Sequence, residues 1–135
     1  MPAGKNPLYR ILDANFNRSK EGLRVCEDVC RYVWNNKVLS CAFKDLRHAL
    51  TAAVENLGIL KALSSRNVEG DVGRLTGERA RKDLAAVFRA NAQRVKESLR
   101  VLEEIAKLID LKTAMRVKNL RYKMYALEQK ALKRS

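Results

Sequence analysis

The stretch DANFNRSKEGLRVCED, Asp13–Asp28, returns in altered form as RANAQRVKESLRVLEE, Arg89–Glu104. When Ala14–Cys30 is aligned with Ala90–Ala106, nine of the seventeen positions are identical. Both segments are rich in Ala, Leu, Glu, Lys and Arg, which are good helix formers. The repeat therefore predicts a chain built from two similar helical halves.

The similarity extends into a second element of each half. FKDLRH at Phe43–His48 matches VKNLRY at Val117–Tyr122, with Lys, Leu and Arg in common. Each half therefore indicates a helical hairpin, and we expect an all-α fold: an antiparallel four-helix bundle made of two pseudo-symmetric helical hairpins. The 135 residues suffice for a single domain. It should contain hairpin one at about 7–65, a glycine-rich loop at 66–77 and hairpin two at about 78–133.

Punctuating residues set the expected helix ends. Asn6 and Pro7 suit the N-cap and first position of a helix that runs to about Trp34, before the break at Asn35-Asn36. Thr76 is the expected N-cap of the third helix. The four predicted helices span 7–34, 39–65, 77–109 and 113–133.

The charge of the chain restricts its ligands. There are 28 Lys and Arg against 15 Asp and Glu, a formal net charge of +13, which favours nucleic acid, a membrane surface or phosphorylated metabolites. An aromatic content of 6% disfavours a stacking platform for single-stranded nucleic acid.

Other compositional features narrow the class of protein. Three Cys and one His disfavour a disulfide framework and a zinc site. There is no signal-like segment and no apolar run of membrane-spanning length, so we expect a cytoplasmic protein without a membrane partner. The sequence leaves a homo-oligomer open.

Two polar residues of the first repeat fall on its apolar stripe. Asn15 and Arg18 align with Ile11 and Val25 at about 100° per residue, and Asn91 and Arg94 do the same in the second repeat. These Arg side chains either pair internally with Glu21, Glu97, Glu27 or Glu103, or face a polar cavity that binds an anion. Gly22 and Ser98 would open that cavity. Spacing alone leaves both alternatives open.

Residues around the stripe form a second group of candidates. Glu21 and Glu97 lie at its edge, whereas Arg24 and Arg100 face the opposite side, where pairing with a nearby acid is the simpler interpretation. On the second and fourth helices, Arg47 and Arg121 border the apolar stripes as either phosphate clamps or snorkelling surface residues. His48 falls on the outward face.

The loop SSRNVEGDVGRLTG, Ser64–Gly77, is a further candidate site. Gly70 and Gly73 permit close backbone approach to a ligand, Asp71 supplies an acid, and Arg66 precedes them. The alternative is a connection whose glycines only satisfy turn geometry. The loop lacks the GxxxxGK[ST] pattern and a preceding strand, so it is not a Walker P-loop.

In combination, these motifs resemble a known family. RILDANFNRSKEGLRVCEDVCRYV, KDLRH, SRNVEGDVG and ANAQRVKESLRVLEEIAK occur in the order and approximate spacing of a small helical family of thiamin biosynthesis. Its members occur alone or fused to the N-terminus of thiamin-phosphate synthase. The resemblance covers about Tyr9 to Lys130, and because the sequence stops at Ser135 we expect a stand-alone version.

The resemblance implies a hydroxymethylpyrimidine-phosphate kinase. Such an enzyme transfers a phosphoryl group from ATP to 4-amino-5-hydroxymethyl-2-methylpyrimidine phosphate, and thiamin-phosphate synthase consumes the diphosphate product. The family pattern at the loop is R-D-x-x-G-D-V-G, and Asn67 replaces its Asp. This puts Asn67 in doubt as a metal ligand and makes Asp71 the better candidate.

Phosphoryl transfer depends mainly on positioning and charge neutralisation, which assigns roles to the candidates. We expect Arg18 and Arg94 to hold phosphates, and Asp71 to bind Mg²⁺ or accept the hydroxyl proton. Glu21 or Glu97 should share these roles with Asp71, while the Gly70–Gly73 segment covers the ligand. The remaining expected ligand-binding residues are Asn15, Asn91, Arg47 and Arg66.

Two alternatives belong to other classes. A non-catalytic helical module that partners thiamin-phosphate synthase would have its inward Arg residues paired internally. A basic bundle that binds nucleic acid would need its Lys and Arg excess on one outward face. That reading is disfavoured because segments such as RVKESLRVLEE alternate the two charges.

Overall fold

The described part of the chain is helical. The computed structural model describes residues 5–58, 69–73 and 79–134, and there it has no strands. Its long helices are α1 (Lys5–Asp28), α2 (Lys37–Val54), α4 (Leu84–Ala106) and α5 (Leu111–Leu132). A π-helical turn, Val29–Val33, follows α1, and a 3₁₀ turn, Glu55–Leu57, follows α2. The all-α prediction is confirmed.

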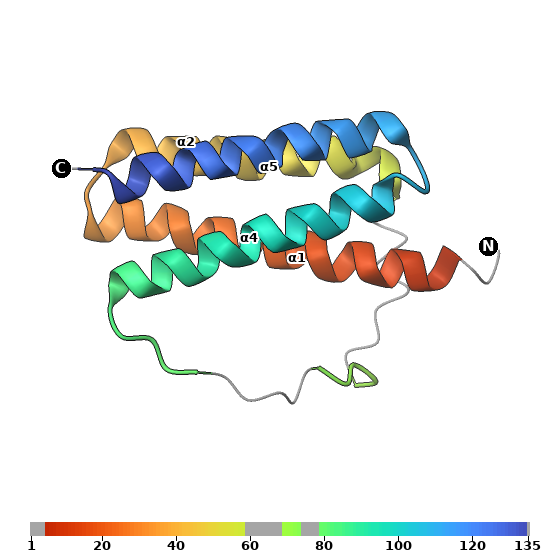
Figure 1. Ribbon diagram of the computed structural model, residues 1–135, viewed down its shortest axis with the longest axis horizontal. Coiled ribbons are helices and arrows are strands. Elements are labelled where there is room, and N and C mark those ends of the chain that lie inside the picture. The colour runs from red at the N-terminus through yellow and green to blue at the C-terminus, as the bar shows by residue number, and fades with distance from the viewer. Residues whose placement is uncertain (1–4, 59–68, 74–78, 135) are drawn as a thin grey trace.

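The four helices form an antiparallel bundle (Figure 1). The hairpins α1–α2 and α4–α5 pack side by side, so that α1 lies against α4 and α2 against α5. Neighbouring helices run in opposite directions. As a result α2 ends at the opposite end of the bundle from the start of α4.

Short polar side chains begin α2 and α4. The Oδ1 atom of Asn36 accepts a hydrogen bond from the backbone N–H of Leu39 at 2.9 Å, and Oδ1 of Asp83 does the same for Ala86 at 2.8 Å. Each bond satisfies a backbone donor that a helix start leaves unpaired. The break at Asn35-Asn36 is confirmed, and Asn35 adopts a positive φ of 49°.

Two predicted helix ends are wrong. The third long helix begins after Asp83 and not after Thr76, which lies outside the described residues, because Asp83 provides the cap. The second helix does not continue to Ser65 as a regular helix: Gly58 has a φ of 74° and terminates the 3₁₀ turn. That left-handed conformation is one that glycine adopts without steric cost.

A single apolar core joins the four helices. Phe43 of α2 and Phe88 of α4 are fully buried and meet edge to face, with their ring centroids 5.8 Å apart. Trp34 stacks at a tilt against Phe88, at 5.1 Å. Since each contact joins one hairpin to the other, neither hairpin buries its apolar face alone.

The buried face of α1 differs from the predicted stripe. Leu12, Leu23 and Cys26 are fully buried, whereas Ile11 is 36% exposed. Arg18 and Arg94 are both exposed and do not point into the core. The inward orientation predicted for them is therefore wrong, because small and aromatic residues also contribute to the buried face and rotate it away from the Ile and Val positions.

Gly22 marks the closest approach of α1 and α4. A Cβ atom added there would lie 2.7 Å from Cγ2 of Val95 and 3.1 Å from the carbonyl oxygen of Asn91. Nearby, the hydroxyl groups of Ser19 and Ser98 are hydrogen-bonded at 2.6 Å across the helix interface. Gly22 therefore permits two backbones to pack closely, and it does not open a cavity, which was one of the two alternatives that the spacing left open.

The duplication appears in the geometry of each half. Nδ2 of Asn15 donates to the Ile11 carbonyl, and Nδ2 of Asn91 donates to the Val87 carbonyl, both at 2.9 Å.

In the described part of the chain, none of the helices combines the length and apolarity that crossing a membrane requires.

Candidate functional site

A cavity lies between α1 and α4, and we call it the α1–α4 cavity. It has a volume of about 350 Å³. Its lining comes from both sequence repeats and from the segment that precedes α4: Asn15, Arg18, Arg81, Ala90, Arg94, Glu97, Ser98 and Val101. Four of the predicted site residues therefore meet here: Asn15, Arg18, Arg94 and Glu97.

The cavity has an excess of positive charge. Arg18, Arg81 and Arg94 contribute three guanidinium groups, and among the described residues of the lining Glu97 contributes the one carboxylate. Among the residues that the structure describes, none of these four side chains forms an ion pair. Guanidinium groups bind phosphate oxygens in a planar, bidentate way, so the lining suits a phosphorylated ligand.

Asn15 positions one of the guanidinium groups. Its side chain is 5% exposed, and its Nδ2 donates to the backbone of the preceding turn. The remaining acceptor, Oδ1, lies 3.3 Å from Nη1 of Arg18, which donates to it. Asn15 therefore restrains Arg18 at the wall of the cavity, while the other donors of Arg18 stay available.

Ser98 contributes a fixed polar atom to the same wall. Its Oγ donates to the carbonyl oxygen of Arg94 at 2.7 Å and contacts the Ser19 hydroxyl. Ser98 is almost completely buried, so these bonds satisfy a hydroxyl that would otherwise be costly to bury.

Arg81 is the functional candidate that sequence reasoning missed. It lies two residues before the cap residue Asp83, in an exposed segment, and Nη1 donates to the Arg79 carbonyl at 3.2 Å. The signal available in the sequence was the run ERARKD, which places basic residues at a helix start. This signal was missed because the third helix was expected to begin after Thr76, which put Arg81 inside its first turns.

Other predicted residues lie elsewhere. Glu21 is exposed on α1, and Asn91 is half-buried on α4, but neither lines the α1–α4 cavity. Asp71 and Gly73 lie in an exposed turn, where Oδ1 of Asp71 accepts from the Gly73 N–H at 3.0 Å. Arg66 lies outside the described residues.

Arg47 is committed to a carboxylate. Its Nη2 and Nε donate to Oε1 of Glu27 at 3.1 and 3.2 Å, inside the first hairpin. In the second hairpin, Nε of Arg121 donates to Oε1 of Glu103 at 2.9 Å. Burial alone would lower the pKa of Arg121, but the hydrogen bond and charge of Glu103 raise it above its ordinary value. Each of the two guanidinium groups therefore balances the charge of a glutamate inside the bundle.

These two ion pairs argue against one alternative for Arg18 and Arg94, namely that they pair with glutamates inside the bundle. Glu27 and Glu103 were two of the candidate partners, but Glu27 pairs with Arg47 and Glu103 pairs with Arg121. The exposed Arg24 and Arg100 behave as expected of surface residues: they pair with Asp28 and Glu104 one turn later.

A second cavity lies on the other side of α4, and we call it the α4–α5 cavity. It has a volume of about 340 Å³ and is lined by Gln93, Lys96, Glu97, Arg100, Arg121 and Tyr125. Its cations already have acidic partners: Lys96 Nζ is 2.7 Å from Glu128, and Arg100 and Arg121 pair as described above. The two cavities therefore differ in kind, although Glu97 lines both.

The described residues contain no cluster of three or more His, Cys, Asp or Glu side chains that could hold a metal ion unaided. Mg²⁺ in phosphoryl-transfer sites is commonly bound through one or two carboxylates together with substrate phosphates. Glu97 fits that donor set, because it lines the same cavity as three guanidinium groups that would bind the phosphates.

Comparison with known proteins adds an independent finding. The sequence model of the ThiD2 family matches residues 10–130. The chain is similar to the thiamine-phosphate synthase of Synechocystis sp., with 45% identity over 129 residues that cover 93% of this chain and 36% of that protein. It is also similar to the thiamine-phosphate synthase of Thermosynechococcus vestitus, with 44% identity over 126 residues, 90% of this chain and 34% of that protein.

A more distant relative has the same name. The thiamine-phosphate synthase of Rhodopirellula baltica is 37% identical over 127 residues, covering 92% of this chain and 34% of that protein. The chain therefore spans about a third of the length of the curated relatives that it matches. No solved structure matches it.

Proposed function

Because the chain belongs to the ThiD2 family, we propose that it is an ATP-dependent kinase of thiamin biosynthesis. It would phosphorylate 4-amino-5-hydroxymethyl-2-methylpyrimidine phosphate to the diphosphate. The observation that carries this proposal is the α1–α4 cavity, whose lining has one carboxylate and three guanidinium groups without ion-pair partners among the described residues. Both substrates bring phosphates, which such a cavity would attract.

The reaction needs charge neutralisation more than acid–base chemistry. An oxygen of the acceptor's phosphate attacks the γ-phosphorus of ATP, a new P–O bond forms, and the bond from that phosphorus to the bridging oxygen breaks. ADP leaves with the electron pair. A phosphate oxygen is largely ionised at neutral pH, so no residue has to remove a hydroxyl proton, and the role of base is not required of Glu21, Glu97 or Asp71.

Each residue of the α1–α4 cavity then has a role in binding phosphates or Mg²⁺. Arg18 and Arg94 would hold the reacting phosphates from opposite repeats, and Arg81 would approach them from the segment before α4. Glu97 would bind Mg²⁺, which supplies positive charge to the phosphates when it is bound. Asn15 would act through Arg18 by restraining its guanidinium group.

The test is direct detection of the product. Purified protein is incubated with the pyrimidine phosphate, ATP and Mg²⁺, and the diphosphate and ADP are followed by ³¹P NMR. We expect both products in equal amounts, and a loss of about a hundredfold in kcat/KM for Arg18→Ala or Arg94→Ala. The matched control is Arg24→Ala, an exposed arginine of the first repeat that lines neither the α1–α4 cavity nor the cavity between α4 and α5, and it should keep full activity.

A second candidate function is supported by the comparisons. Since the matching relatives are named thiamine-phosphate synthase and this chain spans about a third of their length, the chain could be a non-catalytic module that binds that enzyme. Absence of diphosphate under conditions where a known pyrimidine-phosphate kinase works, together with a measurable complex with thiamine-phosphate synthase, would favour the module and reject the kinase.

A further inference from the structure

The α4–α5 cavity contains an aromatic ring and an amide with no assigned role. Tyr125 is 44% exposed, and Gln93 stands on the same lining. Resting on the proposed kinase activity, we infer that this cavity binds the nucleoside of the donor nucleotide, with its phosphates reaching over α4 into the α1–α4 cavity. The ligand class is therefore a purine nucleoside triphosphate that spans two cavities.

The chemistry of the lining fits a nitrogenous base. Any base presents a π-face that can stack on an exposed aromatic ring, and the Tyr125 ring stands inside a concave surface of sufficient size. An amide offers both a donor and an acceptor, so Gln93 can match the edge of a base that carries both. Lys96 Nζ lies 5.2 Å from the centroid of the Tyr125 ring and helps to fix its position.

The charges of this lining disfavour phosphate. Lys96, Arg100 and Arg121 are each paired with a carboxylate, at 2.7, 3.2 and 2.9 Å respectively. A phosphate would have to displace those carboxylates, whereas the guanidinium groups of the α1–α4 cavity have no such competitors among the described residues. The uncharged end of a nucleotide therefore belongs between α4 and α5, and its charged end belongs between α1 and α4.

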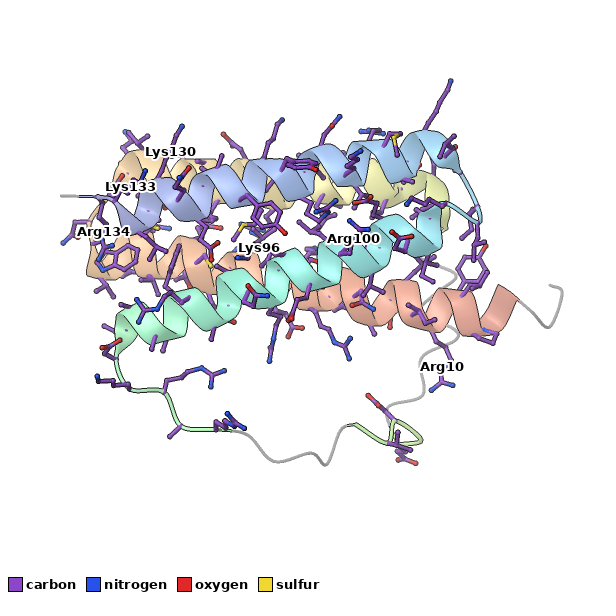
Figure 2. The ribbon with its side chains drawn as sticks, in the orientation of Figure 1. Arg10, Lys96, Arg100, Lys130, Lys133 and Arg134 are labelled. Carbon is purple, nitrogen blue, oxygen red and sulfur yellow. The ribbon has the colours of Figure 1, made fainter. Side chains whose placement is uncertain are left out.

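The two cavities are close enough for one molecule. They run along the two sides of α4 and share Glu97, and Figure 2 shows Lys96 and Arg100 on the side of α4 that faces α5. A helix with its side chains is about 10 Å across, a distance that the ribose and phosphates of an extended nucleotide can bridge. Glu97 would then lie under the phosphates at the crossing, where Mg²⁺ is needed.

The acceptor cannot occupy the α4–α5 cavity in the same way. Its pyrimidine ring is joined to its phosphate through a single methylene and oxygen, and that phosphate must meet the γ-phosphate of ATP. If the phosphates react in the α1–α4 cavity, the pyrimidine ring has to stay beside them. Only the donor nucleotide has a spacer long enough to place a ring across α4.

The experiment measures nucleotide binding to the full chain by isothermal titration calorimetry. Tyr125→Leu should raise the Kd for ATP about tenfold, because stacking is lost, and Tyr125→Phe should leave it unchanged. The matched control is Tyr32→Leu, since Tyr32 is an exposed tyrosine of the π-helical turn after α1 and does not line this cavity. The Kd for inorganic triphosphate should be the same in Tyr125→Leu and wild type, and circular dichroism verifies that each variant is folded.

Two results would overturn the inference. One is an unchanged Kd for ATP in folded Tyr125→Leu; the other is an equal weakening of ATP and inorganic triphosphate binding, which would indicate a general disturbance. The kinase proposal and the nucleotide-site proposal can fail independently, and the experiments tell the two failures apart. If ATP binding depends on Tyr125 but no diphosphate forms, the nucleotide site stands and the kinase does not. If diphosphate forms and Tyr125→Leu keeps its KM for ATP, the kinase stands and the site is elsewhere.

Discussion

Arg121 of α5 and Glu103 of α4 form a buried ion pair, with Nε of the arginine 2.9 Å from Oε1 of the glutamate. Their side chains are only 9% and 4% exposed. The first hairpin holds the same arrangement between Arg47 and Glu27, at 3.1 Å. The repeat in the sequence thus carries one buried charge pair into each hairpin, and both pairs are structural elements of the bundle.

Breaking the second pair should destabilise the protein strongly. Arg121→Leu leaves the Glu103 carboxylate buried without its partner, and such losses cost about 3–5 kcal/mol in the free energy of unfolding. Urea denaturation followed by circular dichroism measures this quantity. Arg100→Leu provides the matched comparison, because the Arg100–Glu104 pair is exposed and exposed pairs contribute about 0–1 kcal/mol.

The double variant Glu103→Leu/Arg121→Leu distinguishes a broken pair from general loss of packing. Replacing both partners with apolar side chains removes the unpaired charge, so the double variant should be more stable than Arg121→Leu alone. An equal or greater loss in the double variant would show that the pair is needed for more than charge balance.

Gly22→Ala should destabilise the bundle even though alanine favours helix by about 1 kcal/mol. The added Cβ would lie 2.7 Å from Cγ2 of Val95, a β-branched and fully buried side chain with little freedom to move. Overpacking of this kind costs roughly 1–3 kcal/mol, so we expect a net loss of stability in urea denaturation.

A double-mutant cycle with Val95→Ala tests that explanation. Removing Cγ2 creates room for the new methyl group, so Gly22→Ala should be less harmful in the Val95→Ala background than in wild type. Additive effects of the two changes would mean that the backbone of α4, and not the Val95 side chain, sets the clash.

Arg81→Ala should reduce kcat/KM for the pyrimidine phosphate about tenfold, by withdrawing one guanidinium group from the α1–α4 cavity. Arg79→Ala is the matched control, because Arg79 lies on the same exposed segment but does not line the cavity. Steady-state kinetics with the two variants measures the difference. Equal activity in both would remove Arg81 from the binding site.

The repeat was sufficient to predict the helices and the antiparallel bundle, because two amphipathic hairpins have few other ways to bury their apolar faces. It did not determine the rotation of α1 about its axis. Ser19 and Cys26 are fully buried, whereas sequence reasoning had relied on Ile11 and Val25. A shift of one residue turns a helix by about 100°, enough to move Arg18 from the core to the rim of a cavity.

The start of α4 could not be predicted for a topological reason. Thr76 and Asp83 are both acceptable helix caps, and local propensity does not choose between them. In the folded bundle α2 and α4 run in the same direction, so α4 begins at the opposite end of the bundle from the end of α2 (Figure 1). Arg81 precedes this start and lines the α1–α4 cavity, a position that becomes visible only in three dimensions.

The buried thiols should make stability fall in alkaline solution. Burial raises the pKa of Cys30 to about 11, against a smaller opposing effect of the Arg134 charge, and burial also raises the pKa of Cys26. A pKa that is higher in the folded than in the unfolded protein stabilises the fold below the ordinary thiol value near 9. That contribution is lost as the pH rises through about 11.

The measurement compares wild type with Cys30→Ala by urea denaturation between pH 7 and pH 11, so that lysine and tyrosine titration affects both proteins alike. We expect a constant difference in the free energy of unfolding up to about pH 8, followed by a decline in wild type relative to the variant as the unfolded thiol ionises. A difference that stays constant to pH 11 would contradict the raised pKa. Thiol labelling at neutral pH gives a second check: Cys41 is exposed and should react, while Cys26 and Cys30 should remain protected until urea unfolds the protein.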